Sequence, residues 1–348
     1  FEEFVRDRPN HPAVVTAMFW IGKAKAHEGK TDEAKQVLVT ELQKNINDPK
    51  RDTVETLLDQ LAQLCSKPPR PLPGKEPAAA PGATPVPYDA AAELDLRLAA
   101  LASGANQTGH ARLLYARAQL AKLQRRAADY DKLNLQIATQ FLPEELSPLL
   151  LANAGDALLA QGNAEKAAKF YNELKEFYPN STYRDSAEVG LAEIAFRKKD
   201  YAGALEIFTA AADLAGAKVK EATVGEARSL VELGRYDEAR KLFEQIAAMR
   251  EWRGETTAEA VYALGDIQAR QQKWAEAVAY YQRVFVLYQR FLPWVAKSYI
   301  GAAESFDRMG KRPEAVGHLR EMLRNEKLRD FPETEHAREM LQGWGESA

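Results

Sequence analysis

The sequence predicts an all-α fold: a right-handed superhelix of about eight helical hairpins, closed by a C-terminal capping helix. Three observations predict it. An alanine recurs every 35 to 38 residues from Ala167 onward. A small residue stands twelve positions before each of these alanines, and nine of the 17 prolines fall at the expected ends of helices, where a missing N–H costs little.

The repeat is an alanine followed four residues later by an aromatic residue or leucine, and it occurs six times. The pairs are Ala34/Leu38, Ala167/Tyr171, Ala204/Phe208, Ala239/Phe243, Ala277/Tyr281 and Ala315/Leu319. The preceding small residues are Gly22, Gly155, Ala192, Ala227, Gly265 and Ala303. Two antiparallel helices approach closely where both offer small side chains, and the larger residue fills the space beside them. The pattern therefore predicts stacked helical hairpins.

The expected elements follow in order along the chain. The helix pairs are 12–28/31–45, 51–65/89–103, 108–125/127–141, 146–161/163–177, 182–198/200–215, 217–233/235–249, 255–271/273–290 and 294–309/311–325, with a last helix at 333–344. Eight prolines concentrate in residues 66–88, a Pro/Ala/Gly-rich segment that is either a loop within one repeat or a linker between two arrays.

These patterns divide the chain into five expected regions. They are N-terminal helices at 1–65, the loop or linker at 66–88, degenerate helices at 89–145, a regular array at 146–325 and a capping helix at 326–348. The opening residues resemble the internal segment 170–181. We therefore expect the chain to begin inside a repeat whose first half lies upstream; a protein that starts nearby is the alternative.

Composition and motifs argue against several classes of function. The chain of 348 residues carries 47 Lys and Arg against 50 Asp and Glu, a formal net charge of -3, so we expect no nucleic-acid partner. A single cysteine, Cys65, leaves no disulfide framework or multi-cysteine zinc site. We expect no membrane span, because no stretch reaches the roughly 18 to 20 apolar residues required. No HExxH, GxxxxGK[ST] or GxSxG motif is present, so the sequence predicts a non-enzymatic protein without metal or cofactor.

The repeats resemble the tetratricopeptide (TPR) family over residues 12–50 and 108–325. The best unit matches the family pattern at Gly155, Ala167, Tyr171 and Pro179. The period here is a few residues longer than the family's, and the family's early tryptophan is replaced in every unit. The residues at that position are Leu151, Glu188, Thr223, Val261 and Tyr299.

The resemblance implies a concave groove lined by the first helix of each pair, with partner-contacting side chains at the second, fifth, ninth and thirteenth places of each unit. The candidate groove residues are Val189, Glu193, Arg197, Val224, Arg228, Tyr262, Asp266, Arg270, Ile300, Glu304 and Arg308. The fifth places are apolar, which disfavours a clamp for a C-terminal carboxylate. The ninth and thirteenth places predict acid–base pairs within one helix: Glu193–Arg197, Asp266–Arg270 and Glu304–Arg308, with Arg228–Glu232 reversed. These pairs either present a mixed-charge surface to a peptide or only satisfy each other.

The favoured function is therefore a non-enzymatic scaffold that binds a peptide, helix or protein in its groove, as part of a larger bacterial protein. The alternative is a regulatory or substrate-presenting arm of a multidomain enzyme whose catalytic domain lies outside this chain. Self-association through exposed repeat ends is a third possibility. The phrase at residues 177–181 resembles repeats of bacterial cell-envelope TPR proteins, such as outer-membrane assembly lipoproteins and Tol–Pal partners. It favours the periplasm or cell envelope, with the cytoplasm as the alternative.

Overall fold

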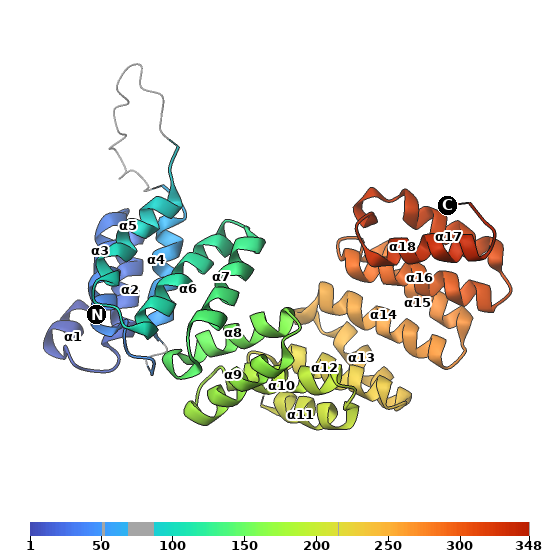
Figure 1. Cartoon of the computed structure of the whole chain (residues 1–348), viewed down its shortest axis with the longest axis horizontal. Helices are drawn as coiled ribbons and strands as arrows, with labels where there is room; N and C mark the ends of the chain where they lie inside the picture. The colour runs from blue at the N-terminus through green and yellow to red at the C-terminus, as the bar shows by residue number, and fades with distance from the viewer. Residues whose placement is uncertain (51–52, 69–86, 215, 348) are drawn as a thin grey trace, which may run out of the picture. The chain divides into compact units, whose positions relative to one another are not determined.

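The computed structural model describes residues 1–50, 53–68, 87–214 and 216–347, and in them it contains 18 α-helices, three short 3-10 turns and no strand (Figure 1). The helices are α1 (Glu2–Asp7), α2 (Val14–His27), α3 (Thr31–Asn45), α4 (Thr53–Cys65), α5 (Ala90–Ala102), α6 (Gln107–Leu123), α7 (Ala127–Gln140), α8 (Pro148–Ala160), α9 (Ala164–Phe177), α10 (Arg184–Arg197), α11 (Tyr201–Asp213), α12 (Val219–Glu232), α13 (Tyr236–Ala248), α14 (Glu255–Arg270), α15 (Trp274–Leu287), α16 (Leu292–Arg308), α17 (Arg312–Arg324) and α18 (Pro332–Gly343). The all-α fold predicted from the sequence is confirmed.

The predicted helices are all present among the described residues, and their ends differ from the predicted ones by at most three residues. The six-residue helix α1 ends two residues before Pro9. Most of the predicted loop or linker at 66–88 lies outside the described residues, which stop at residue 68 and resume at residue 87.

The chain divides into two compact units, Phe1–Gly190 (unit 1) and Leu191–Ala348 (unit 2), and the division falls inside α10. Consecutive helices pack as hairpins, such as α2–α3 and α8–α9 in unit 1 and α14–α15 in unit 2, and the second helix of a hairpin also contacts the first helix of the next. In unit 2, for example, α15 packs against both α14 and α16. This double contact makes each unit a continuous stack rather than a set of separate hairpins.

Helix α4 departs from the predicted pairing. The sequence paired it with the helix at 89–103, but α4 packs chiefly against α6 and α3 and contacts α5 less extensively. Its apolar residues Leu57, Leu58, Leu61 and Ala62 are all fully buried. Because α2, α3, α5 and α6 surround it, α4 is a central helix of unit 1 rather than one half of a simple hairpin.

Glycines allow aromatic rings to pass between neighbouring hairpins. Tyr281 of α15 lies between Gly265 of its own hairpin and Gly301 of the next, where added Cβ atoms would come within 2.8 and 2.6 Å of its ring. Phe208 of α11 lies in the same way against Gly225 of α12, at 2.4 Å. These separations are shorter than non-bonded carbon–carbon contacts allow, so only glycine fits at these positions. The sequence pattern predicted Gly265 but missed Gly225 and Gly301.

The turns between paired helices need one residue with a left-handed backbone. Four turns place glycine there, and Gly29, Gly162, Gly234 and Gly310 have φ between 73 and 81°. Three other turns place Arg125, Lys199 and Gln272 there, with φ of 59 to 64°. Non-glycine residues adopt this conformation at an energetic cost, so these turns are maintained by the helices they join.

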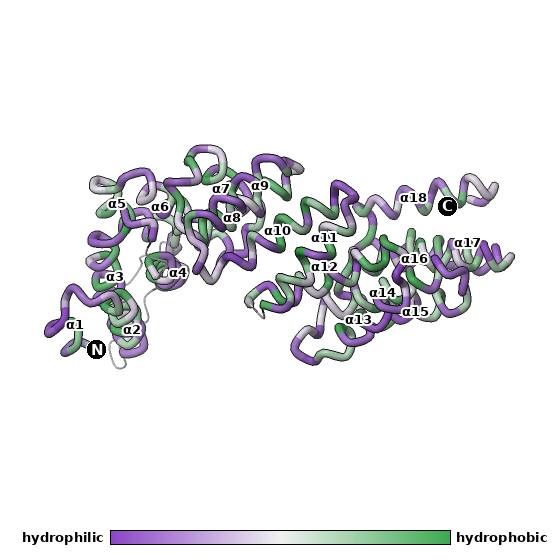
Figure 2. Tube along the Cα trace, turned by 90° about the horizontal axis from the view of Figure 1, so that it is seen from below, coloured by the Kyte–Doolittle hydropathy of each residue, from purple (hydrophilic) through white to green (hydrophobic). Residues whose placement is uncertain are grey.

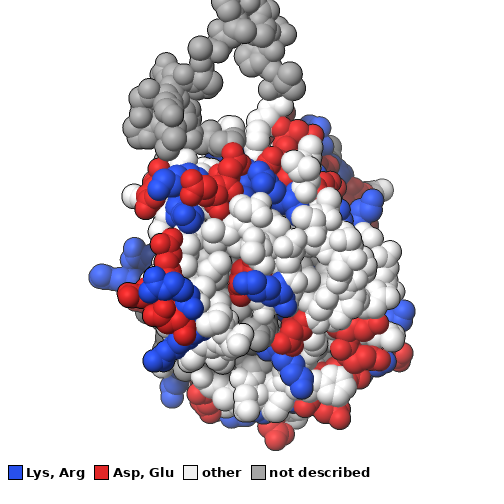
Figure 3. Space-filling model, turned by 90° about the vertical axis from the view of Figure 1, so that its left-hand side faces the viewer, with Lys and Arg blue, Asp and Glu red and all other residues white. Residues whose placement is uncertain are grey.

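Both units show the amphipathic pattern expected of stacked helices, because hydrophobic and hydrophilic residues alternate along them (Figure 2). On the face drawn in Figure 3, acidic and basic side chains are interspersed with uncharged ones, and neither sign dominates. No helix among the described residues has the length and apolar character needed to cross a bilayer.

Candidate functional site

Two adjoining pockets open along the first helices of successive hairpins in unit 2. Pocket A has a volume of about 400 Å³ and receives side chains from α10, α12, α14 and α16, with Phe243 of α13 at its base. Its lining residues are Phe196, Arg228, Val231, Glu232, Phe243, Glu259, Tyr262, Ala263, Asp266, Trp294 and Lys297. Pocket B, of about 650 Å³, shares Tyr262, Asp266 and Lys297 with pocket A and extends to α18. Together they form the unit 2 groove.

Seven of the eleven predicted groove residues line these pockets. Arg228 lines pocket A, Tyr262 and Asp266 line both pockets, and the remaining four line pocket B: Arg270, Ile300, Glu304 and Arg308. The other four predicted residues do not line either pocket. Val189 belongs to unit 1, Val224 is buried in the core of unit 2, and Glu193 and Arg197 lie on α10 beside pocket A.

The charged residues pair both within and between helices. The predicted pairs Glu193–Arg197 and Asp266–Arg270 are confirmed, at 3.1 and 2.8 Å. The reversed pair Arg228–Glu232 is replaced by contacts to neighbouring helices. These contacts are Arg228–Glu193 at 3.5 Å and Arg270–Glu232 at 2.7 Å.

Arg270 therefore binds two carboxylates at once, Asp266 on its own helix and Glu232 on α12. Burial alone would lower the pKa of the Arg270 guanidinium, but the two carboxylates outweigh burial and raise it. The predicted pair Glu304–Arg308 is not among the ion pairs within 4.0 Å in the described part of the chain, where Glu304 instead lies 4.0 Å from Nε2 of His336 on α18.

Aromatic rings form the apolar part of pocket A, and basic groups lie on two of them. The ring of Tyr262 lies 5.5 Å from that of Trp294, between centroids. The Arg228 guanidinium stands 4.4 Å from the Phe196 centroid, and the Lys297 ammonium 4.6 Å from the Trp294 centroid. Both distances are within the range of cation–π attraction.

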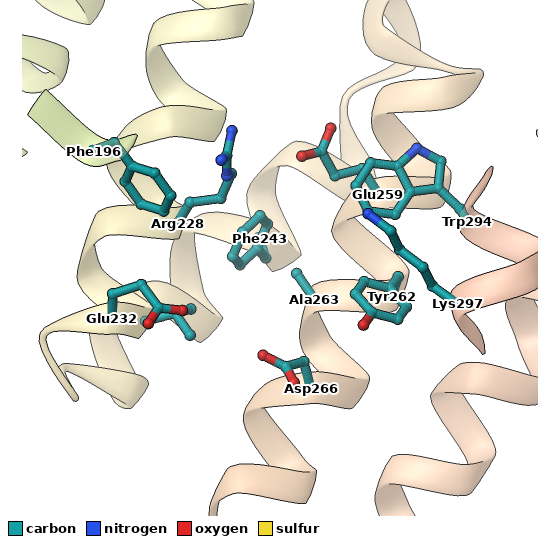
Figure 4. Close-up of a pocket in the computed structure, with 11 residues that line it drawn as sticks. Phe196, Arg228, Glu232, Phe243, Glu259, Tyr262, Ala263, Asp266, Trp294 and Lys297 are labelled. Carbon is teal, nitrogen blue, oxygen red and sulfur yellow. The ribbon is translucent and has the colours of Figure 1, made fainter. Parts of the chain in front are cut away.

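Glu259 is the unusual carboxylate of pocket A. Figure 4 shows its side chain between Arg228 on one side and Trp294 and Lys297 on the other. Unlike Glu232 and Asp266, it forms no ion pair within 4.0 Å among the described residues. Burial raises the pKa of the Glu259 carboxyl, and the positive charges of Arg228 and Lys297 oppose that rise only in part.

Sequence reasoning missed four residues that shape pocket A: Phe196, Glu259, Trp294 and Lys297. A signal for two of them was available. Glu259 stands three residues before Tyr262, and Lys297 three residues before Ile300. Because Tyr262 and Ile300 occupy the fifth places of their repeats, Glu259 and Lys297 occupy the second places. No periodic rule identified Phe196 and Trp294. Among the described residues, no group of three or more His, Cys, Asp or Glu side chains is arranged to hold a metal ion.

Family comparisons agree with the repeat pattern. Models of the tetratricopeptide repeat match residues 153–181, 195–251 and 224–286. The chain contains tetratricopeptide repeats. The matches at 195–251 and 224–286 span the pocket A residues from Phe196 to Asp266 but not Trp294 and Lys297, and no curated protein matches the chain.

Solved structures with a similar arrangement include the apo form of RapI. It is 10% identical, the match covers 96% of this chain and 100% of RapI, and the TM-score is 0.52, which shows a shared fold. The TPR protein YrrB, described as having an unusual peptide-binding site, is 19% identical over 56% of this chain and 92% of its own, with a TM-score of 0.37. A TPR protein from Parabacteroides merdae is 15% identical over 78% of this chain and 92% of its own, with a TM-score of 0.41.

Proposed function

We propose that unit 2 is a non-enzymatic binding module that holds a peptide segment of a protein partner in the unit 2 groove. The observation that carries the proposal is the continuity of pockets A and B along the first helices of three successive hairpins, from Arg228 on α12 through Tyr262 on α14 to Ile300 on α16. A hollow that crosses several helices suits a ligand longer than a metabolite.

The chemistry of the groove suits a peptide. Tyr262, Trp294 and Ile300 provide apolar surface, and the ionised side chains of Arg228, Asp266 and Arg270 stand among them. Peptides bind in helical grooves by placing apolar side chains in pockets while polar groups fix their register. The ion pairs between helices support this role, because they hold the charged groups in place before a ligand arrives.

The test uses peptides selected from a random twelve-residue display library against the full chain, with affinity measured by fluorescence anisotropy. Tyr262→Ala removes the ring shared by both pockets, and we expect it to weaken binding by about tenfold or more. Arg270→Glu breaks two ion pairs of the groove and should weaken binding as well.

Arg240→Glu is the matched control. The Arg240 side chain on α13 is 43% exposed, pairs with Asp237 at 3.5 Å and lines neither pocket, so this variant should bind like the unchanged chain. Unchanged affinity of the Tyr262→Ala and Arg270→Glu variants would contradict the proposal, because the peptides would then bind elsewhere.

A further inference from the structure

We propose that pocket A receives a basic side chain, lysine or arginine, from the bound peptide, and that Glu259 is its counter-ion. This inference rests on the proposed function, since it names the chemistry of the peptide that the unit 2 groove would hold. It goes further in assigning one ligand side chain to one pocket.

The charge of the groove favours a basic partner. Acidic residues outnumber basic ones in the combined lining of the two pockets. The six carboxylates are Glu232, Glu259, Asp266, Glu304, Asp307 and Glu333, and the four basic residues are Arg228, Arg270, Lys297 and Arg308. A peptide that brings positive charge is therefore attracted, and one that brings negative charge meets an excess of its own sign.

Within pocket A, the excess negative charge resides on Glu259. The other two carboxylates of the pocket, Glu232 and Asp266, are bound by Arg270 at 2.7 and 2.8 Å. Glu259 is partly removed from water, as the rise in its pKa reflects, and it has no comparable partner. A carboxylate in this setting gains more from an incoming cation than an exposed carboxylate does, because the cation replaces solvation already lost.

The basic residues of pocket A are already engaged. Arg228 lies on the Phe196 ring and contacts Glu193 at 3.5 Å, while Lys297 lies on the Trp294 ring. They are therefore less available to an incoming anion than Glu259 is to an incoming cation. Their positions also show that rings of this pocket accept positive charge.

The shape of the pocket fits a long side chain with an apolar stem. Lysine and arginine can lay their methylene groups along the rings of Tyr262 and Trp294 while the charged end reaches Glu259. A pocket of about 400 Å³ accommodates such a side chain, but it also accommodates a large apolar one. Charge, rather than size, therefore distinguishes the expected ligand.

The experiment measures preference at each position of a peptide already known to bind the full chain. Every position is replaced in turn by lysine, arginine, glutamine and glutamate, and affinities are measured by fluorescence anisotropy. We expect one position at which lysine or arginine binds about tenfold more tightly than glutamine, with glutamate the weakest. Glu259→Gln should remove most of that preference, so that the lysine, arginine and glutamine peptides bind with similar affinities.

Glu226→Gln is the matched control. Glu226 on α12 is also a partly buried carboxylate with a raised pKa, but it lines neither pocket, so its loss should leave the preference intact. If peptides bind and respond to Tyr262→Ala, but no position prefers a basic residue or Glu259→Gln keeps the preference, this inference is wrong and the proposed function stands. If no peptide binds, or binding ignores Tyr262→Ala, both are wrong.

Discussion

One ion pair in unit 1 and one in unit 2 place charged side chains in opposite surroundings. In unit 1, Arg112 and Glu55 form a 2.7 Å ion pair whose side chains are 0% and 1% exposed. In unit 2, Arg270 and its two carboxylates line the open groove, and the arginine is 38% exposed. Ion pairs of similar length thus join helices in the interior of one unit and line an open groove in the other.

The buried pair in unit 1 takes the place of repeat-like packing around α4. Arg112 on α6 donates hydrogen bonds to Glu55 on α4 and to the backbone carbonyls of Ile46 and Asp48, which follow α3. The Ser147 hydroxyl, just before α8, donates to the same Glu55 oxygen at 2.6 Å. One guanidinium therefore connects α6, α4 and the segment that follows α3.

The largest effect that would test this contrast comes from Arg112→Ala. It leaves the Glu55 carboxylate buried without its cation, and we expect a loss of about 3–5 kcal/mol in the free energy of unfolding. Arg270→Ala, on the groove surface, should cost less than about 1 kcal/mol. Urea unfolding followed by circular dichroism measures both.

A double variant sharpens this result. Replacing Arg112 and Glu55 together by methionine removes both charges, so it should be less destabilising than Arg112→Ala alone. Equal losses for Arg112→Ala and Arg270→Ala would show that the two units do not differ in the way we describe.

A smaller effect is expected from Gly225→Ala in the regular repeats of unit 2. The new methyl group would lie 2.4 Å from the buried ring of Phe208, which has no room to move, and this should cost about 1–3 kcal/mol. Gly317→Ala on α17 is the control, because no atom lies within 4 Å of the added group. There the change should stabilise the helix by about 0.5–1 kcal/mol. A stabilising Gly225→Ala would refute the ring–glycine contact.

The smallest effect concerns Glu259 and is a dependence on pH. Folding raises the pKa of the Glu259 carboxyl above its value in the unfolded chain, near 4.5. Ionisation of this carboxyl therefore destabilises the folded state increasingly as the pH rises from about 4.5 through the pKa of the folded chain. Glu259→Gln should therefore raise the melting temperature at pH 7, by less than about 4 °C, and leave it unchanged near pH 4.

Glu238→Gln should behave in the opposite way, because Arg235 lowers the pKa of the exposed Glu238 carboxyl. Its effect should be a slight loss of stability at pH 7, measured by differential scanning fluorimetry on the same samples. A melting temperature that falls at pH 7 in Glu259→Gln would contradict the assignment of Glu259 as a carboxylate held at a cost to stability.

The sequence predicted the fold well because the repeat is a local rule. Alanine, glycine and aromatic spacing within one hairpin, as at Gly265 and Tyr281, locates helices without knowledge of their neighbours. The same reasoning failed where the contact is between hairpins. It missed Gly225 and Gly301, and it paired α4 with the wrong helix because burial on several sides looks like one apolar stripe in sequence.

For the candidate site too, residues within one repeat could be predicted, but contacts between repeats could not. Repeat position identified Tyr262, Asp266 and Arg270, and the second places of the same and the next repeat hold Glu259 and Lys297. The pairing of Arg270 with Glu232 could not be deduced, because the two residues are 38 positions apart and meet only through the packing of α14 on α12. The lack of an ion-pair partner for Glu259 depends on the same geometry.

The ring of Tyr281, enclosed by glycines of two successive hairpins, constrains how such a chain can evolve. Deleting part of a repeat would leave the ring facing a bulky residue or water, whereas gaining or losing a whole period keeps the spacing between the ring and its glycines. The length of the array can therefore change by duplication or loss of complete hairpins, and a single-residue insertion inside a helix is the change it tolerates least.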